Sequence, residues 1–484
     1  MKHLETITLI GLLDGAGPVS RVSFAKSKGK LPMKIKTIVI AVAVASATWW
    51  LAPSSVYALA SFARQTGLAC SACHMSFPEL TPVGRDFKLH GFTTSVNNLT
   101  EEGTNKGSAL SLIEDVPLSI SFQTSVTATD RSQPSSQSPS VEFPQQINFW
   151  LAGQITPHFG TFLQLTYTAS SDTFSGDSSD VRFFGTETKL AGKSLVWGID
   201  ANNNPTIEDL WNSTPAFGFA YANPDSAGFL PAAATMIDGA LATQVIGGGP
   251  YVMLDNHLYA LVEVYRSQHL GTPQPENGVT GTVPNPINIQ AVAPYWRLAW
   301  QQNIGKNNYF EVGTYGIYVS SYPGAVSGPT DSYVDFAGDA SYELTLANGD
   351  MIVLHSTFIH EMTNLGASVA AGNASQANDD LNTFRLDASY HFGSKLTFTA
   401  GPFLTWGTSD VLRYPAGSLS GYSNGSPNNN GFLVQAAYWP WQNFEIGLQY
   451  RGFITFNGAS TNYDGNGRNA SDNNTFYGFV WINF

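Results

Sequence analysis

Apolar and polar residues alternate through most of the chain beyond residue 116. Trp296, Leu298 and Trp300 share one face of an extended segment, whereas Arg297 and Gln301 share the other. A period of two residues is the pattern of β-strands whose two faces meet different surroundings. The same alternation recurs at residues 334–344, 446–451 and 476–484. The pattern therefore predicts an all-β fold.

The segments between these strands alternate in length. Short turns are expected near Pro157, Gly192, Asn256, Gly305, Gly349, Gly393 and Pro440. Long polar loops are expected at residues 129–140, 169–180, 202–235, 268–292, 320–331, 363–380, 409–430 and 457–473. Short turns on one side and long loops on the other are typical of outer-membrane barrels. A soluble β-sandwich is the alternative, but it does not require this alternation.

We therefore predict a transmembrane outer-membrane β-barrel of about 16 strands, surrounded by outer-membrane lipid. The first strand leads into a long loop and the last strand follows one. Because the short turns of such barrels face the periplasm, both chain ends are expected there.

Composition agrees with this fold. Charged residues make up only 12% of the 484 residues, whereas soluble domains carry about 25%. The net charge of −13 includes no basic run, so we expect no nucleic-acid partner. Residues 268–292 and 410–430 are poor in carboxylates. Such segments suit an acidic medium, because acid changes their charge little; ordinary loops rich in serine and asparagine are the alternative.

The N-terminal region has the order of a secretory signal peptide. Two lysines precede an apolar run at residues 38–51, and small residues follow it. Cleavage is expected after Ala58 or Ala60. Residues 1–32 fit the signal poorly, so Met33 is the expected start of translation.

The only two cysteines of the chain lie in residues 70–74, which read Cys-Ser-Ala-Cys-His. This pattern is the attachment signature of c-type haem. Cys70 and Cys73 would form thioethers to the two vinyl groups, and His74 would ligate the iron. A redox-active or structural cysteine pair beside an unrelated histidine is the alternative. We predict one covalently bound haem c.

These features divide the chain into three parts. The parts are residues 1–60, an upstream extension and signal peptide; residues 61–115, a monohaem cytochrome c segment; and residues 116–484, the outer-membrane β-barrel porin. The lumen of such a barrel is wide enough for water. We expect residues 61–115 to plug it; a haem below the barrel mouth is the alternative.

The second haem ligand is left open by the sequence. His90 is a candidate because it lies within loop reach of a haem at His74. Met75 directly follows His74 and cannot reach the opposite haem face, and Met236 lies far along the chain. A ligand from another chain, or none, is a further alternative. Arg64 can pair with a haem propionate, or it can anchor the segment to the barrel.

Three further segments are distinctive. Residues 58–67 read Ala-Leu-Ala-Ser-Phe-Ala-Arg-Gln-Thr-Gly, and residues 77–85 read Phe-Pro-Glu-Leu-Thr-Pro-Val-Gly-Arg. Residues 204–212 read Asn-Pro-Thr-Ile-Glu-Asp-Leu-Trp-Asn. With residues 70–74, they resemble the fused monohaem cytochrome c–porin family of bacterial outer-membrane iron oxidases, of the acidophilic iron-oxidising type.

The resemblance implies an enzyme, an iron:cytochrome c oxidoreductase. Extracellular Fe(II) would be oxidised at the haem iron held by His74, and electrons would pass to a periplasmic cytochrome c or blue-copper protein. The alternatives are an outer-membrane electron conduit for another donor and a diffusion porin with a structural haem plug. The sequence shows no histidine–carboxylate cluster with ligand spacing. It therefore assigns no residue to Fe(II) itself.

Overall fold

The structure is a computed structural model that describes residues 59–96, 99–101, 111–113, 116–134, 136–224, 233–268 and 287–484. The predicted signal peptide, up to residue 58, and the expected start at Met33 lie outside these ranges. Within them, no helix has the length and apolar character needed to cross a membrane.

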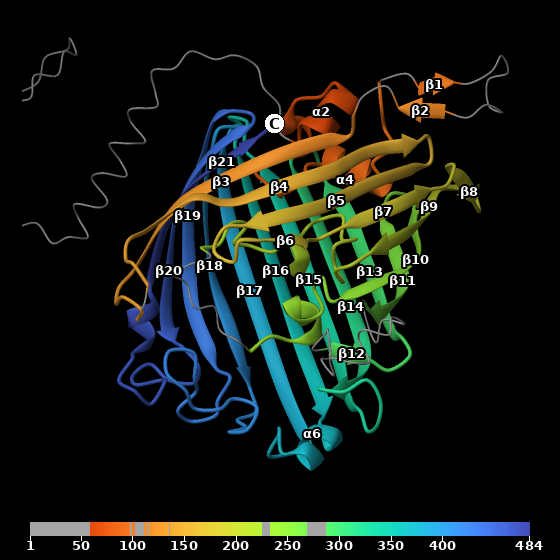
Figure 1. Cartoon of the computed structure of the whole chain (residues 1–484). Helices are drawn as coiled ribbons and strands as arrows, with labels where there is room; N and C mark the ends of the chain where they lie inside the picture. The colour runs from red at the N-terminus through yellow and green to blue at the C-terminus, as the bar shows by residue number, and fades with distance from the viewer. Residues whose placement is uncertain are drawn as a thin grey trace, which may run out of the picture. The chain divides into compact units, whose positions relative to one another are not determined.

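Sixteen antiparallel strands form a closed barrel in the described part of the chain (Figure 1). They are β3 (Leu118–Thr129), β4 (Ser140–Thr156), β5 (Phe159–Thr168), β7 (Asp180–Phe184), β9 (Lys193–Asn202), β10 (Val245–Leu254), β11 (Leu258–Ser267), β13 (Ala293–Ile304), β14 (Asn308–Pro323), β15 (Asp331–Thr345), β16 (Met351–Asn364), β17 (Asn378–Phe392), β18 (Leu396–Gly407), β19 (Asn429–Trp441), β20 (Phe444–Thr455) and β21 (Thr475–Asn483). The last strand closes the barrel by pairing with the first, with Thr127 opposite Tyr477. The predicted fold class is confirmed.

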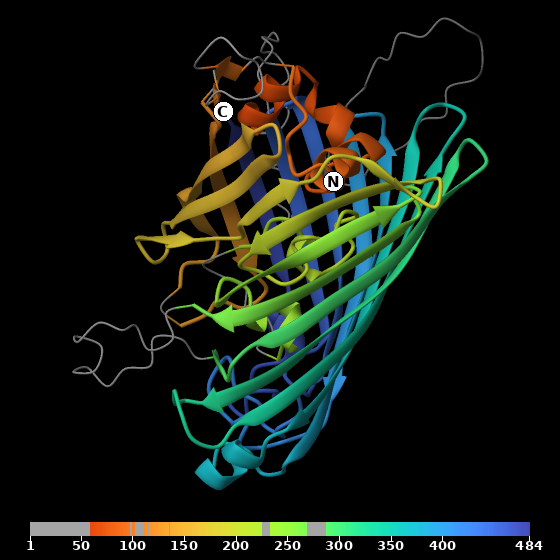
Figure 2. The ribbon, with the colours of Figure 1, turned by 90° about the vertical axis from the view of Figure 1, so that its right-hand side faces the viewer.

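Short turns and long loops alternate around the barrel, as predicted. The long loops contain short elements of their own. These are β6 (Thr173–Gly176), η2 (Pro215–Phe217), η3 (Met236–Ala240), β12 (Ile287–Ile289), α6 (Gly366–Ala371) and η4 (Ala470–Asn473). A further strand, β8 (Thr188–Leu190), pairs with β9 beside a short turn. In Figure 2 the strands run obliquely between the two ends of the barrel.

The two faces of the strands differ as the sequence pattern predicts. On β13, Leu298 is 44% exposed and Arg297 is 1% exposed. On β15, Phe336 is 57% exposed and Asp335 is 2% exposed. Apolar side chains therefore face outward and polar side chains face the barrel interior, as in barrels whose outer face contacts lipid.

The long loop between β9 and β10 lies inside the barrel. Its residues 206–211 are buried, and Leu210 and Trp211 pack with inward-facing tyrosines of the wall such as Tyr259. The carboxylate of Asp209 accepts a hydrogen bond of 2.9 Å from Arg297 on β13. A buried guanidinium requires such partners, because an unpaired buried charge is costly. The ion pair thus fixes this loop to the inner wall.

The segment that precedes the barrel contains α2 (Ala60–Thr66), α3 (Cys70–Cys73) and α4 (Pro82–Leu89), followed by a small sheet of β1 (Leu99–Glu101) and β2 (Ser111–Ile113). The backbone N–H of Cys70 donates to Gln442, in the short turn after β19. The Tyr251 hydroxyl on β10 donates to the Leu89 carbonyl at 2.8 Å. Residues 59–96, here called the haem segment, therefore contact the inner wall at the short-turn end. That they plug the lumen stays a prediction.

One glycine marks how closely the haem segment approaches the wall. A Cβ added at Gly160 on β5 would lie 2.0 Å from the Gly91 carbonyl oxygen. We expect Gly160→Ala to displace the haem segment at a cost of about 1–3 kcal/mol, because neither backbone can yield without strain. Limited proteolysis in detergent micelles should show faster cleavage near Gly91, while the barrel keeps its heat-modifiable migration on gels.

Gly338→Ala on β15 is the matched control. A Cβ at Gly338 meets its nearest neighbour, the Gly313 carbonyl oxygen, at 3.6 Å, which is ordinary van der Waals contact. Equal protease resistance of the two variants would contradict the close docking of the haem segment.

Candidate functional site

Local structure places the two cysteines and the histidine together. Helix α2 ends at Gly67, whose left-handed backbone (φ +66°) reverses the chain direction. The single turn of α3 brings Cys70 and Cys73 to one side, because residues three apart are neighbours on a helix. Helix α4 then begins at Pro82, with the Thr81 hydroxyl accepting a hydrogen bond from the Gly84 N–H.

Cys70, Cys73 and His74 line one cavity of about 470 Å³. Four parts of the chain line it: the haem segment, the wall strands β4, β5, β7 and β21, the loop between β5 and β7, and the loop between β9 and β10. Its lining includes the apolar residues Leu59, Phe62, Leu68, Phe77, Leu80, Phe87, Phe92, Trp150, Phe162, Ile207, Phe217 and Trp481. The volume falls in the range of about 300–1,000 Å³ that small-molecule and cofactor sites occupy.

The residues present fit a c-type haem. Burial lowers the pKa of His74 to about 4, so the imidazole is neutral, which is the metal-ligating form. Its Nδ1 is buried and has no hydrogen-bond partner among the described residues. Both thiols lie on the same cavity, and the apolar lining suits a porphyrin face. The residues predicted to attach a haem, Cys70, Cys73 and His74, thus line a cavity whose chemistry suits one.

Lys88 is a cavity residue that the sequence did not single out. Its ammonium donates to the Asp209 carbonyl and, at 3.2 Å, to Asn212 Oδ1. Burial and the neighbouring Arg182 lower the pKa of Lys88 to about 8, so the group is charged in neutral and acidic solution. Lys88 belongs to no recognisable sequence motif. Its place in the cavity depends on the fold of the loop between β9 and β10, which the sequence does not show.

Arg64 lies elsewhere. Its side chain is exposed, it does not line the cavity, and its Nη2 donates to the Leu118 carbonyl at 2.7 Å. Leu118 is the first residue of β3. The contact supports the anchoring role of Arg64. Lys88, and not Arg64, is the basic residue that lines the cavity, where a haem propionate could be paired.

The structure does not bring His90 to the cavity. Its Nδ1 faces the Asp86 carbonyl at 2.8 Å, and its Nε2 faces Glu187 at 3.1 Å. Burial opposes the charge of the ring, but the hydrogen bonds that the ring donates to Asp86 and Glu187 raise the pKa of His90 to about 9. Both ring nitrogens are thus engaged outside the cavity, and ligation of the iron by His90 stays a prediction.

The methionine alternatives are also absent from the cavity lining. Met236 lies in η3, where its backbone N–H donates to Glu361 at 2.8 Å, and Met75 is not among the lining residues. No second histidine or methionine lines the cavity within the described part of the chain.

The segment from Asn204 to Trp211 is buried, in contrast to a surface loop. Ile207 reaches the cavity, and Asn212, Phe217 and Tyr221 continue its lining. This loop therefore completes a site that the haem segment begins.

Three features agree: the apolar outer face, the closed strand order, and the alternation of short turns with long loops. All three are typical of outer-membrane barrels. The chain is a porin-like outer-membrane β-barrel.

No protein-family model matches it, and no curated protein matches it. Three solved structures are similar at low identity. OmpT of Vibrio cholerae is 9% identical over 76% of this chain and 96% of that one (TM-score 0.38). OmpF of Salmonella typhi in complex with daunomycin is 11% identical, over 76% and 97% (TM-score 0.43). A mutant Rh. blastica porin is 11% identical, over 76% and 99% (TM-score 0.36).

Replacement of His90 tests whether its imidazole ligates the haem iron or has only a structural role. We expect His90→Gln to leave the α-band of the reduced haem unchanged in position, because the ring does not line the cavity. A shifted band or a changed spin state in this variant would show that His90 ligates the iron.

The difference in stability between wild type and His90→Gln should depend on pH. The ion pairs of His90 stabilise the fold fully below its ordinary pKa of 6.5 and lose their effect as the pH rises through about 9. Because Asp86 and Glu187 are more than half exposed, the effect is at most about 1 kcal/mol. The difference in thermal midpoint between wild type and His90→Gln should therefore be largest near pH 6 and vanish above about pH 9.

Proposed function

We propose that this protein is a cytochrome–porin of the outer membrane that oxidises extracellular Fe(II) and passes the electrons through a covalently bound haem c to a periplasmic carrier. One observation supports the proposal above the others. The attachment motif at residues 70–74 opens onto a single cavity that only the folded barrel completes. The resemblance of the sequence to iron-oxidising cytochrome–porins supplies the substrate.

A bound haem supplies one-electron redox chemistry. The residues of this chain would bind and orient it: Cys70 and Cys73 would hold its edge, and neutral His74 would ligate the iron. The charged ammonium of Lys88 is placed to pair with a propionate. The aromatic rings around the cavity exclude water, which strengthens electrostatic interactions inside it.

The orientation of the barrel gives the reaction its direction. The haem segment contacts the wall at the short-turn end, next to Gln442, and short turns of such barrels face the periplasm. Both termini are accordingly proposed to be periplasmic, and a periplasmic cytochrome or copper protein takes the electron there. Since the cavity lies toward this end, the donor approaches it from the long-loop side, through the barrel interior.

Direct iron oxidation has a plain kinetic signature. We expect the oxidised, purified protein to develop the reduced α-band rapidly when it is mixed with Fe(II) at acidic pH in a stopped-flow spectrometer. A variant with both cysteines replaced, Cys70→Ser with Cys73→Ser, should retain the barrel and show no α-band. If dithionite reduces the haem of the wild type and Fe(II) does not, the protein is a conduit for another donor.

The barrel interior predicts low conductance. Leu210, Trp211 and Ile237 of the interior loop pack against the wall tyrosines, and the haem segment lies at the short-turn end. In planar lipid bilayers we therefore expect conductance at least about tenfold below that of open porins with water-filled lumens. Steady large channels from the haem-loaded protein would favour a diffusion porin with a structural haem.

A further inference from the structure

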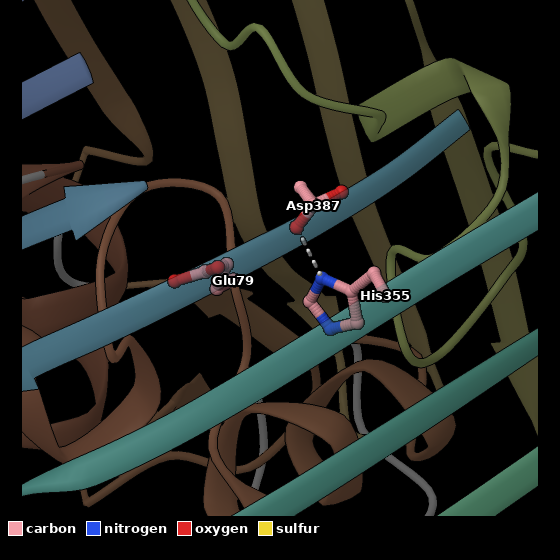
Figure 3. A group of neighbouring side chains, drawn as sticks. All are labelled: Glu79, His355 and Asp387. Carbon is pink, nitrogen blue, oxygen red and sulfur yellow. Dashed lines mark ion pairs between the residues drawn. The ribbon is translucent and has the colours of Figure 1, made fainter. Parts of the chain in front are cut away.

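Two histidines and two acidic residues meet beside the haem segment. Glu79 follows α3, His355 lies on β16, and Asp387 and His391 lie on β17. The last two are four residues apart and so share the inner face of their strand. Figure 3 shows Glu79, His355 and Asp387 gathered in one place, although they come from three separate elements. We call these four residues the Glu79 cluster.

The donor atoms of three members, Glu79, His355 and Asp387, are close enough to share an ion, and His391 contacts Glu79 beside them. One donor atom from each of Glu79, His355 and Asp387 lies within 4.8 Å of the others. His355 Nδ1 is 3.4 Å from Asp387 Oδ2, and His391 Nε2 is 3.2 Å from Glu79 Oε2. Ligands at about 2.1 Å from a common metal lie within about 4.2 Å of one another. Small side-chain rotations close the remaining gap.

Two polar atoms of the cluster are buried without hydrogen bonds. Asp387 is 7% exposed and His391 is 2% exposed, and neither Asp387 Oδ2 nor His391 Nε2 has a hydrogen-bond partner among the described residues. Buried polar atoms are normally satisfied. Their contacts are the ion pairs to His355 Nδ1 at 3.4 Å and to Glu79 Oε2 at 3.2 Å, which a bound ion would replace.

The charge of the cluster points to a cation. Glu79 and Asp387 are both buried, and within the described ranges neither forms an ion pair with a lysine or arginine. Their ionic contacts are to His391 and His355 alone. A divalent cation between the two carboxylates would compensate both charges while the imidazoles act as neutral ligands.

We propose that the Glu79 cluster binds one divalent transition-metal ion and, on the function proposed above, that this ion is substrate Fe(II). Imidazole and carboxylate ligands with positions left open are the set that Fe(II) takes in non-haem sites. Neighbouring groups hold the ligands in place: Tyr221 and Ser389 each donate to Glu79 Oε1 at 3.1 Å, and Thr397 contacts His391 Nδ1 at 2.9 Å. Such outer contacts accompany metal ligands.

The cluster adjoins the haem cavity. Tyr221 lines that cavity and donates to Glu79, while Pro78 and Leu80 on either side of Glu79 line it as well. Fe(II) in the cluster would lose one electron to become Fe(III), and the oxidised haem iron held by His74 would gain that electron. A periplasmic carrier would take that electron in turn, and the product ion would leave toward the long loops.

Metal binding can be measured apart from the redox reaction. The full-length, haem-loaded protein is reduced with dithionite and dialysed at pH 6.5 against Co(II), whose binding is counted by elemental analysis. We expect one Co(II) per chain in the wild type. Asp387→Asn and His355→Gln should each weaken binding tenfold or more, because each removes one ligand. Because the two variants are independent, the test remains valid if one of them misfolds.

Glu445→Gln is the matched control. Glu445 is a buried lumenal carboxylate on β20, 5% exposed, outside the cluster. This variant should bind Co(II) as the wild type does, and all variants should keep the heat-modifiable barrel and the haem spectrum. No stoichiometric Co(II) in the wild type, or equal affinity in wild type, Asp387→Asn and His355→Gln, would overturn the site.

Stopped-flow mixing with Fe(II) distinguishes this proposal from the function on which it rests. If Co(II) binds as expected but Fe(II) fails to reduce wild-type haem, the result supports the metal site and contradicts the proposed iron oxidation. If Fe(II) reduces wild-type and Asp387→Asn haem at equal rates, iron oxidation stands and the cluster is not its donor site. Slower reduction in Asp387→Asn and His355→Gln, with Glu445→Gln unchanged, supports both.

Discussion

The buried guanidinium of Arg297 is the constraint on which the interior of this barrel depends. Its side chain is fully buried and holds Asp339 of the wall at 2.8 Å and Asp209 of the interior loop at 2.9 Å. Removing one partner of such a network costs roughly 3–5 kcal/mol, because a charge is left unpaired. The loop between β9 and β10 is thereby held inside, where it forms part of the cavity wall.

The haem segment is fastened by the same kind of interaction. Arg85 pairs with Glu343 on β15, and Lys88 donates to the carbonyl of Asp209 in the interior loop. Apolar burial alone is non-directional, whereas these charge-assisted hydrogen bonds fix one orientation. The segment, the loop and the wall therefore form a composite site, and no one of them would enclose a cavity by itself.

This arrangement links a proposed redox centre to a proposed metal site. Tyr221 of the interior loop touches both the haem cavity and Glu79, so the loop that completes one site also orients a ligand of the other. A donor held by strand residues and an acceptor held by the haem segment would lie on rigid elements, which keeps their separation fixed.

The sequence by itself determined the barrel and the haem motif. Strand alternation such as Trp296–Arg297–Leu298 and the alternating loop lengths follow from one face meeting lipid and the other the lumen, and residues 70–74 carry their chemistry in a contiguous motif. Only the tertiary structure decided the rest. His90 lies within loop reach of the attachment motif in the sequence, yet Asp86 and Glu187 hold it elsewhere. Glu79 precedes His355 by 276 residues, and Asp387 follows His355 by 32. Strand register and burial bring distant residues together, and no local pattern records those contacts.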